Sequence, residues 1–199
     1  MTILELNGER LLEHLDQLAG LRLSIFREYP YLYDGLLEDE RRYLSGYAAQ
    51  GQVLLAVDND QVAGAITGMP LAEESGAFVE PFRAAGLAPE QYYYIGELLL
   101  LPPYRGLGWG SRLLARLEQL VAQQGRYPVC CLATVARPED HPLRPDRFVP
   151  IERFCRRHGY RPIEGVVARV TWREIDGLST IKTLTFWQKS LGQTMEGKQ

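Results

Sequence analysis

The most distinctive hydrophobic pattern in the chain is a nearly continuous apolar run from Tyr92 to Leu101, which ends in four consecutive leucines. Such a run predicts a central strand that is covered on both faces. Two prolines and a glycine-rich turn follow it, and apolar residues then recur at helical spacing up to Gly125. Because Val129–Val135 is a second apolar segment, the order strand, helix, strand predicts a βαβ unit with parallel strands.

The rest of the chain predicts shorter elements on either side of this unit. Before it we expect a strand, two helices and a β-hairpin, over residues 2–6, 9–25, 37–50, 53–57 and 62–69. After it we expect a short helix and two antiparallel strands, over residues 151–158, 166–172 and 183–187. Gly20 is a candidate break in the first helix, and Glu40 belongs to an acidic first turn that suits the dipole of the second. Residues 73–90 form a polar connection, for which a short helix is left open. The whole chain, 1–199, predicts a single α/β domain (α+β type) with a mixed sheet.

Composition narrows the class of protein. The chain is 46% hydrophobic and 24% charged, as in ordinary globular proteins, and its net charge of −3 argues against a nucleic-acid binder. No apolar run approaches the roughly 20 residues that span a bilayer, and the first residues do not resemble a secretory signal. The three cysteines have neither metal-ligand nor disulfide spacing. We therefore expect a cytoplasmic protein without a metal site, a membrane or a nucleic-acid partner.

The turn after the leucine-rich strand carries the clearest chemical signal. Backbone N–H groups at a helix N-terminus, together with the helix dipole, favour a phosphorylated ligand. A mononucleotide P-loop needs Lys followed by Ser or Thr, which this turn lacks, and a dinucleotide fingerprint needs glycine where Ser111 stands. The pattern R-x-x-G-x-G remains, filled by Arg105, Gly108 and Gly110. Its two glycines permit close backbone approach to a pyrophosphate and can adopt positive φ.

With these residues in place, the chain resembles the GNAT superfamily of N-acetyltransferases. The resemblance rests on E-L-L-L-L-P-P-Y-R-G-L-G-W-G-S-R-L-L, from Glu97 to Leu114, and on F-C-R-R-H-G-Y, from Phe154 to Tyr160, which is similar to the family's F-Y-x-x-x-G-F element. The order of expected elements also agrees over nearly the whole chain. The resemblance implies a splayed mixed sheet with flanking helices and an acyltransferase that uses acetyl-CoA (coenzyme A).

The resemblance also implies which residues bind the cofactor. The acetyl-CoA would lie between the strand that contains Leu98–Leu101 and the strand Val129–Val135. The backbone of Leu99, Leu100 and Leu101 would pair with the pantetheine arm as an added strand does. Backbone N–H groups of the turn would hold the pyrophosphate, through Arg105, Gly106, Leu107, Gly108, Trp109, Gly110 and Ser111. An alternative for Gly106 and Gly110 is simple packing between strand and helix.

Acetyl transfer to an amine requires a base, because an alkyl ammonium of pKa ~10.4 costs roughly 4.6 kcal/mol to deprotonate at neutral pH. Glu97 is the candidate, since the resembling family often has an acid at this place and an apolar strand raises a carboxyl pKa. The alternative is that Glu97 pairs with an arginine or a backbone group. Cys155 stands where many members have a proton-donating tyrosine, and either donates a proton or fills the core. His141 either transfers a proton or orders the proline-rich loop 136–150.

The acceptor is the least legible part of the sequence. The aromatic segment 26–35 predicts a substrate pocket lined by Tyr29, Tyr31 and Tyr33, or simply core packing. Residues 137–161 carry seven Arg and four acids, so Arg144 is a candidate contact for an acidic group on the substrate or for cofactor phosphates. We expect a small-molecule amine or a peptide as substrate, and leave open a homodimer. A non-catalytic acyl-CoA-binding or sensory module on the same fold is the alternative function.

Overall fold

One mixed sheet of seven strands organises the protein, as seen in a computed structural model that describes residues 1–192. The strand order is β1-β2-β3-β4-β5-β7-β6. The strands are Thr2–Leu6 (β1), Gln52–Asp58 (β2), Gln61–Pro70 (β3), Tyr92–Leu100 (β4), Val129–Val135 (β5), Arg161–Arg173 (β6) and Ser179–Ser190 (β7). The helices are Gly8–Glu13 (α1), Leu15–Phe26 (α2), Leu37–Gln50 (α3), Gly76–Ala84 (α4), Trp109–Gln124 (α5) and Ile151–Arg157 (α6).

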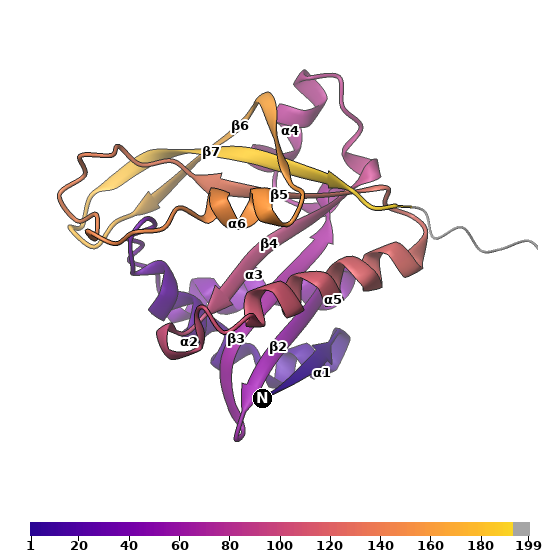
Figure 1. Cartoon of the computed structure of the whole chain (residues 1–199), viewed down its shortest axis with the longest axis horizontal. Coiled ribbons are helices and arrows are strands. Elements are labelled where there is room, and N and C mark those ends of the chain that lie inside the picture. Colours follow the sequence, from indigo (N-terminus) through magenta and orange to yellow (C-terminus); the bar gives the residue numbers. More distant parts are fainter. Residues whose placement is uncertain (193–199) are drawn as a thin grey trace, which may run out of the picture.

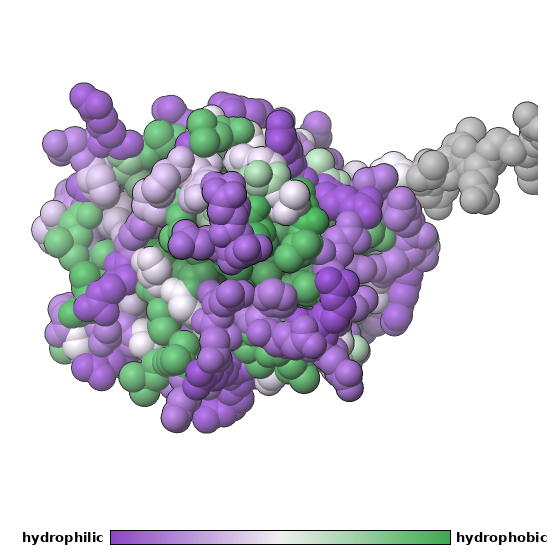
Figure 2. Space-filling model, turned by 90° about the horizontal axis from the view of Figure 1, so that it is seen from below, coloured by the Kyte–Doolittle hydropathy of each residue, from purple (hydrophilic) through white to green (hydrophobic). Residues whose placement is uncertain are grey.

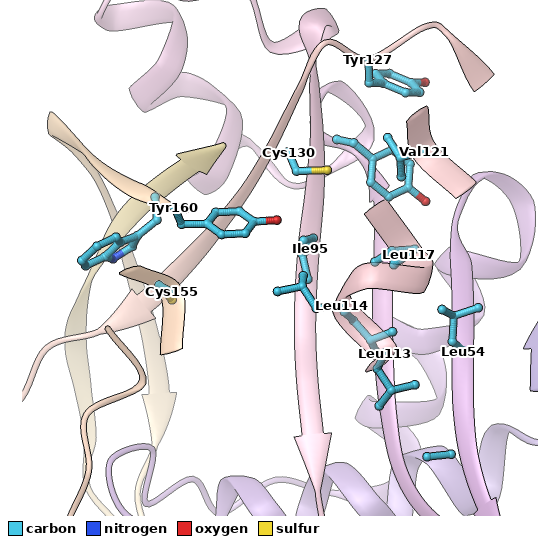
Figure 3. Close-up of a cluster of buried hydrophobic side chains, with 14 residues drawn as sticks. Leu54, Ile95, Leu113, Leu114, Leu117, Val121, Tyr127, Cys130, Cys155 and Tyr160 are labelled. Carbon is cyan, nitrogen blue, oxygen red and sulfur yellow. The ribbon is translucent and has the colours of Figure 1, made fainter. Parts of the chain in front are cut away.

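The centre of the sheet is splayed, as the resemblance implied. The strands β4 and β5 are parallel, but their pairing extends only from Tyr92 opposite Val129 to Ile95 opposite Leu132. Beyond that point β4 stays paired with β3 alone, while β5 stays paired with β7. The two strands therefore draw apart toward their carboxyl ends, as Figure 3 shows for the ribbons that carry Ile95 and Cys130.

A β-bulge decides which face of β4 each side chain occupies. The register between β3 and β4 shifts so that Thr67 lies opposite Glu97 and Gly68 lies opposite Ile95, which leaves Gly96 as the extra residue. A bulge inserts one residue and so reverses the alternation of side chains beyond it. As a result, Glu97 shares a face with Tyr94, while Leu98 and Leu100 pack with Ile95 on the opposite face.

Helices cover the two faces of the sheet in separate groups (Figure 1). Helix α5 lies on one face, where Leu113, Leu114, Leu117 and Val121 form a core with Ile95 (Figure 3). On the other face, α1, α2 and α3 pack over the β1–β4 half around Leu18, Leu44 and Leu55. Helix α4 packs over the β5–β7 half through Phe82. The gap between β4 and β5 thus opens between two groups of helices.

Several expected boundaries are wrong. The first helix breaks at His14, between α1 and α2, whereas Gly20 lies inside α2, where a Cβ would meet nothing within 4 Å. A single glycine costs a helix only about 1 kcal/mol, which the packing of α2 offsets. The segment 73–90 contains the short helix that the sequence left open, α4, with Pro81 inside it. The strands β6 and β7 are longer than predicted, because their ladder pairs many exposed polar residues that carry no hydrophobic signal.

The surface agrees with this core. Figure 2 shows the molecule from the side toward which β4 points in Figure 1, and hydrophobic residues gather near the middle of that side among hydrophilic ones. Over the described part of the chain, no helix is long and apolar enough to cross a membrane.

Candidate active site

The glycine-rich turn has the conformation expected of an anion site. Gly106 and Gly108 adopt φ values of +76° and +84°, and Gly108 is the N-cap residue of α5. The amide of Arg112 donates to the carbonyl oxygen of Gly108 at 3.1 Å, and the amides that precede it have no carbonyl partner within the helix. The expectation of positive φ is wrong for Gly110. This residue is buried, and a Cβ on it would contact the side chains of Leu100 and Phe154. The backbone N–H groups at this end of α5 are therefore the ones that a helix leaves without carbonyl partners.

The side chain of Arg105 ties this turn to two other segments. Its Nε donates to the carbonyl oxygen of Leu100 at 2.8 Å, and its two terminal nitrogens donate to the Glu28 carboxylate at 2.7 and 3.1 Å. Glu28 lies just after α2, at the start of the aromatic segment. Arg105 therefore fixes the turn against β4 and against that segment, and its guanidinium is engaged within the protein.

Ser111 has a partner that the sequence did not reveal. Its Oγ lies 3.0 Å from Nε2 of His158, whose ring packs against Phe154 with centroids 4.3 Å apart. Burial lowers the pKa of His158, so the neutral imidazole is favoured. The second family-like element, Phe154–Tyr160, thus meets the glycine-rich turn at the start of α5, which explains why the two motifs occur together.

The edge of β4 next to the turn is open. From Gly96 to Leu100 this strand has no pairing with β5, so one row of its backbone groups faces the gap. An open strand edge can accept an extended ligand by backbone hydrogen bonds. The predicted pairing of Leu99, Leu100 and Leu101 with the pantetheine arm stays a prediction. The Leu101 amide already donates to the carbonyl oxygen of Ala63 at 2.9 Å, and the Leu100 carbonyl oxygen already accepts from Arg105, so the open groups lie before these two.

Glu97 occupies a buried ion-pair network. Glu97 is only 6% exposed, and its Oε1 pairs with Nη1 of Arg22. The same guanidinium pairs with Glu40, which also accepts a hydrogen bond from the Tyr33 hydroxyl at 2.7 Å. Of the two alternatives for Glu97, the structure contains the arginine pair. Its Oε2 has no hydrogen-bond partner among residues 1–192, so one oxygen is uncommitted.

Arg22 and Glu40 were missed from the sequence. Glu40 was assigned to the helix dipole, but it is buried at 2% exposure and serves Arg22. A signal for Arg22 was present, because it lies on the apolar stripe of α2 with Leu18 and Leu21. A charged residue on such a stripe indicates a buried partner, since unpaired buried charges are very costly.

The three tyrosines of the aromatic segment separate in space. Tyr29 packs against Phe148 with centroids 4.7 Å apart, and so contacts the 136–150 loop. Tyr33 points to Glu40. Tyr31 packs on Phe26 at 4.5 Å and lies 6.1 Å from the Trp172 ring, and burial raises its pKa to about 12 against a smaller lowering by Arg22. The three rings therefore contact different elements of the fold.

The loop 136–150 is tied to the rest of the fold through Arg137. Arg137 pairs with the buried Glu174 and donates to the carbonyl oxygens of Pro30 and Tyr31 at 2.7 and 2.8 Å. Lys182 pairs with the same carboxylate. Arg137 thus joins the aromatic segment to β6. It is part of the fold and is not available to a ligand.

Two predicted site residues of this loop, His141 and Arg144, contact aromatic rings near the loop. Nδ1 of His141 accepts the N–H of Leu143 at 3.2 Å, and its ring lies 5.6 Å from that of Tyr29. These contacts order the loop, as one of the alternatives held. The guanidinium of Arg144 lies 5.6 Å from the centre of the Phe148 ring. Its assignment to a substrate or to cofactor phosphates stays a prediction.

Cys155 is packed in the core beneath the gap. It is 1% exposed, and burial, with a smaller contribution from Glu152, raises the pKa of its thiol to about 12. A thiolate nucleophile is disfavoured by such a pKa, and a thiol this buried lies among apolar side chains. The contacts favour the packing alternative. Among residues 1–192, no group of three or more His, Cys, Asp or Glu side chains could hold a metal ion.

If Cys155 only fills the core, replacing it by alanine should change kcat by less than about threefold and lower the free energy of unfolding by about 1 kcal/mol. Steady-state acyl transfer and urea unfolding measure the two effects. A loss of kcat near a hundredfold with intact stability would instead identify the thiol as a proton donor.

Comparisons with known proteins identify the family and the fold. The family model described as "Acetyltransferase (GNAT) family" matches residues 11–143. No curated protein matches the sequence. Several solved structures share its fold. A ribosomal-protein-alanine N-acetyltransferase from Brucella melitensis is 16% identical with a TM-score of 0.63, over 96% of this chain and 100% of that one.

Two further structures give the same result. An aminoglycoside 6'-N-acetyltransferase complexed with coenzyme A is 18% identical with a TM-score of 0.61, over 96% of this chain and 98% of that one. An N-acetyltransferase from Staphylococcus aureus Mu50 is 14% identical with a TM-score of 0.60, over 96% and 100%. At these identities the likeness shows the fold, and the family follows from the matching model. The chain belongs to the GNAT family of acetyltransferases.

Proposed function

We propose that the protein transfers an acetyl group from acetyl-CoA to an amine of a small molecule or a peptide, by direct attack in a ternary complex. The observation that carries this proposal is the open edge of β4 running into the positive-φ turn at the N-terminus of α5. An extended arm and a pyrophosphate would find backbone partners side by side there.

The residues present fit such a donor. Amides of the turn 106–111 would hold the pyrophosphate, with the Ser111 hydroxyl oriented by His158. The strand edge from Gly96 to Leu100 would hold the arm. The partly buried Leu98 and Leu100 would line its path on the α5 side. When bound, acetyl-CoA supplies the thioester carbonyl that the amine attacks.

The chain would contribute a base and alignment. The uncommitted Oε2 of Glu97, directly or through water, would take the proton of the ammonium. The amine nitrogen would then bond to the acyl carbon as the carbon–sulfur bond breaks, and it would lose its second proton to solvent. The thiolate that leaves would gain a proton from solvent or from the Tyr31 hydroxyl, which solvent would reprotonate. Tyr31 joins Cys155 as a candidate donor, and burial raises the pKa of each group to about 12. Holding the reactants in line supplies roughly 7–11 kcal/mol more.

The decisive experiment measures thiol release from acetyl-CoA with a panel of amines. Release that depends on the amine supports the proposal. Binding of acetyl-CoA without transfer to any amine would support the second candidate, a non-catalytic acyl-CoA-binding module, which the Arg22 pairing of Glu97 and the Cys155 substitution favour.

The donor site makes a separate prediction. Replacing Gly108 by alanine forces an L-residue into φ +84° at about 1–2 kcal/mol and should weaken acetyl-CoA binding roughly tenfold by titration calorimetry. Gly125 is the matched control, since it ends the same helix at φ +64°. Alanine there should cost similar stability and leave the dissociation constant unchanged. Equal losses of affinity in both variants would contradict the assignment of the turn.

A further inference from the structure

Near the face of β4 that carries Glu97, tyrosines and carboxylates come together from five segments of the chain. We call them the tyrosine–glutamate cluster: Tyr31, Tyr43, Tyr47, Thr67, Glu74, Tyr94 and Glu97. They come from the aromatic segment, α3, β3, β4 and the turn before α4. None of the motifs found in the sequence includes Glu74 or the tyrosines of α3.

The contacts show that the cluster is one site. The hydroxyls of Tyr43 and Tyr47 are 2.9 Å apart, and the Phe78 ring at the start of α4 lies 5.3 Å from that of Tyr94. The guanidinium of Arg22, which pairs with Glu97, lies 4.4 Å from the centre of the Tyr43 ring. After burial, the charge of Glu74 contributes to raising the pKa values of Tyr43, Tyr47 and Tyr94. Glu74 lies four residues before Phe78, whose ring contacts Tyr94, so the turn that carries Glu74 lies beside the rest of the cluster.

Three buried oxygens of the cluster have no hydrogen-bond partner in the described part of the chain. They are Oε2 of Glu74, Oε2 of Glu97 and Oγ1 of Thr67. Thr67 is 0% exposed and lies opposite Glu97 in the β3–β4 register. Each buried unpartnered group costs about 1–3 kcal/mol, so three on one face point to a polar ligand.

The charges indicate which kind of ligand. Oε1 of Glu74 accepts the Ser75 amide at 2.9 Å, which fixes the carboxylate and leaves Oε2 free. Burial raises the pKa of Glu74, as expected for a carboxylate without a close counter-ion. The guanidinium of Arg22 pairs with Glu97 and Glu40, and its buried Nη1 has no hydrogen-bond partner among residues 1–192. One guanidinium thus stands against the three carboxylates of Glu40, Glu74 and Glu97. Tyrosine faces also attract cations. The cluster is therefore suited to positive charge.

We infer that Glu74 binds a second cationic group of the acceptor, so that the substrate class is a small diamine or polyamine. This inference rests on the proposed function, in which Glu97 receives the proton of the reacting amine. Glu74 then selects the acceptor by its far end, while the rings of Tyr43 and Tyr94 flank the hydrocarbon between the two nitrogens. This substrate class differs from the acidic group that the arginine-rich loop led us to expect, and the two are alternatives for the same acceptor.

Three acceptors of equal length test the inference: 1,4-diaminobutane, butylamine and 4-aminobutanoate. They present a positive, a neutral and a negative far end. In the parent protein, kcat/KM for the diamine should exceed that for butylamine at least about tenfold, the value of a charge-assisted hydrogen bond. In Glu74→Gln the ratio should fall to within about threefold. The control Glu73→Gln alters an exposed neighbour that contacts Gln50, and should leave the ratio as in the parent.

Two results would overturn the inference: a parent that prefers butylamine or 4-aminobutanoate, or a Glu74→Gln protein that keeps the diamine preference. If no acceptor is acetylated, the same compounds are titrated calorimetrically into the protein saturated with coenzyme A. Diamine binding that Glu74→Gln abolishes would then support the subsite while the proposed transfer fails. No tighter binding of the diamine than of butylamine would reject the subsite.

Discussion

Replacing Glu97 by glutamine is expected to lower kcat/KM for amine acetylation by roughly 10²–10⁴-fold near neutral pH. The amide cannot accept the ammonium proton, yet it has nearly the same shape and keeps an acceptor oxygen for Arg22. The deficit should shrink as the pH rises toward the amine pKa of ~10.4, because a growing fraction of the acceptor is then already deprotonated. Initial rates at saturating acetyl-CoA between pH 7 and pH 10 measure both effects.

The protein contains a matched control for this variant. Glu40 pairs with the same guanidinium and is also buried, but it lies on α3, away from the open strand edge. Both Glu40→Gln and Glu97→Gln weaken one arm of the same ion-pair network, and each should cost up to about 3 kcal/mol of unfolding free energy. Only Glu97→Gln should show the pH-dependent loss of rate. Equal kinetic losses in the two variants would mean that Glu97 acts through the fold alone.

The second large effect is expected at Gly96, the extra residue of the β4 bulge. A Cβ at this position would overlap the hydroxyl of Tyr47, whose side chain is fully buried and held by Tyr43. Gly96→Ala should therefore lower the free energy of unfolding by about 1–3 kcal/mol. It should also displace Glu97, the next residue, and a shift of about 1 Å can cost a hundredfold in rate. Urea unfolding and steady-state kinetics measure the two losses.

A second substitution makes this prediction specific. Tyr47→Phe removes the hydroxyl that the new methyl group would strike, so the double variant should recover at least half of the stability lost by Gly96→Ala. Such coupling between two contacting residues is what a double-mutant cycle detects. Gly20→Ala in α2, where a Cβ meets nothing within 4 Å, controls for the loss of a glycine as such. Strictly additive losses would show that steric overlap with Tyr47 is not the cause.

The sequence by itself determined the part of the protein that we assign to the acyl donor, namely β4, the glycine-rich turn and α5. Leu98–Leu101, the glycines of the turn and the stripe of α5 are neighbours along the chain, so local rules suffice to predict strand, turn and helix. The family model that matches residues 11–143 confirms the superfamily recognised from these motifs. The positive φ of Gly108 was expected for the same reason. What local rules assigned wrongly there was Gly110, whose neighbours Leu100 and Phe154 come from other elements.

The surroundings of Glu97, where we propose that the acceptor amine reacts, were decided only by the tertiary structure. The bulge at Gly96 sets the face on which Glu97 lies, and a shift of one residue in register moves a side chain to the opposite face. The ion pairs of Glu97 and Arg137 join residues 75 and 37 positions apart, a distance over which sequence spacing carries no information. Tyr29, Tyr31 and Tyr33 are adjacent in sequence but diverge in space. The position of Glu74 near the rest of the cluster is set when the turn before α4 packs against β4. The sequence does not reveal it, because burial and pairing of charges are properties of the assembled fold.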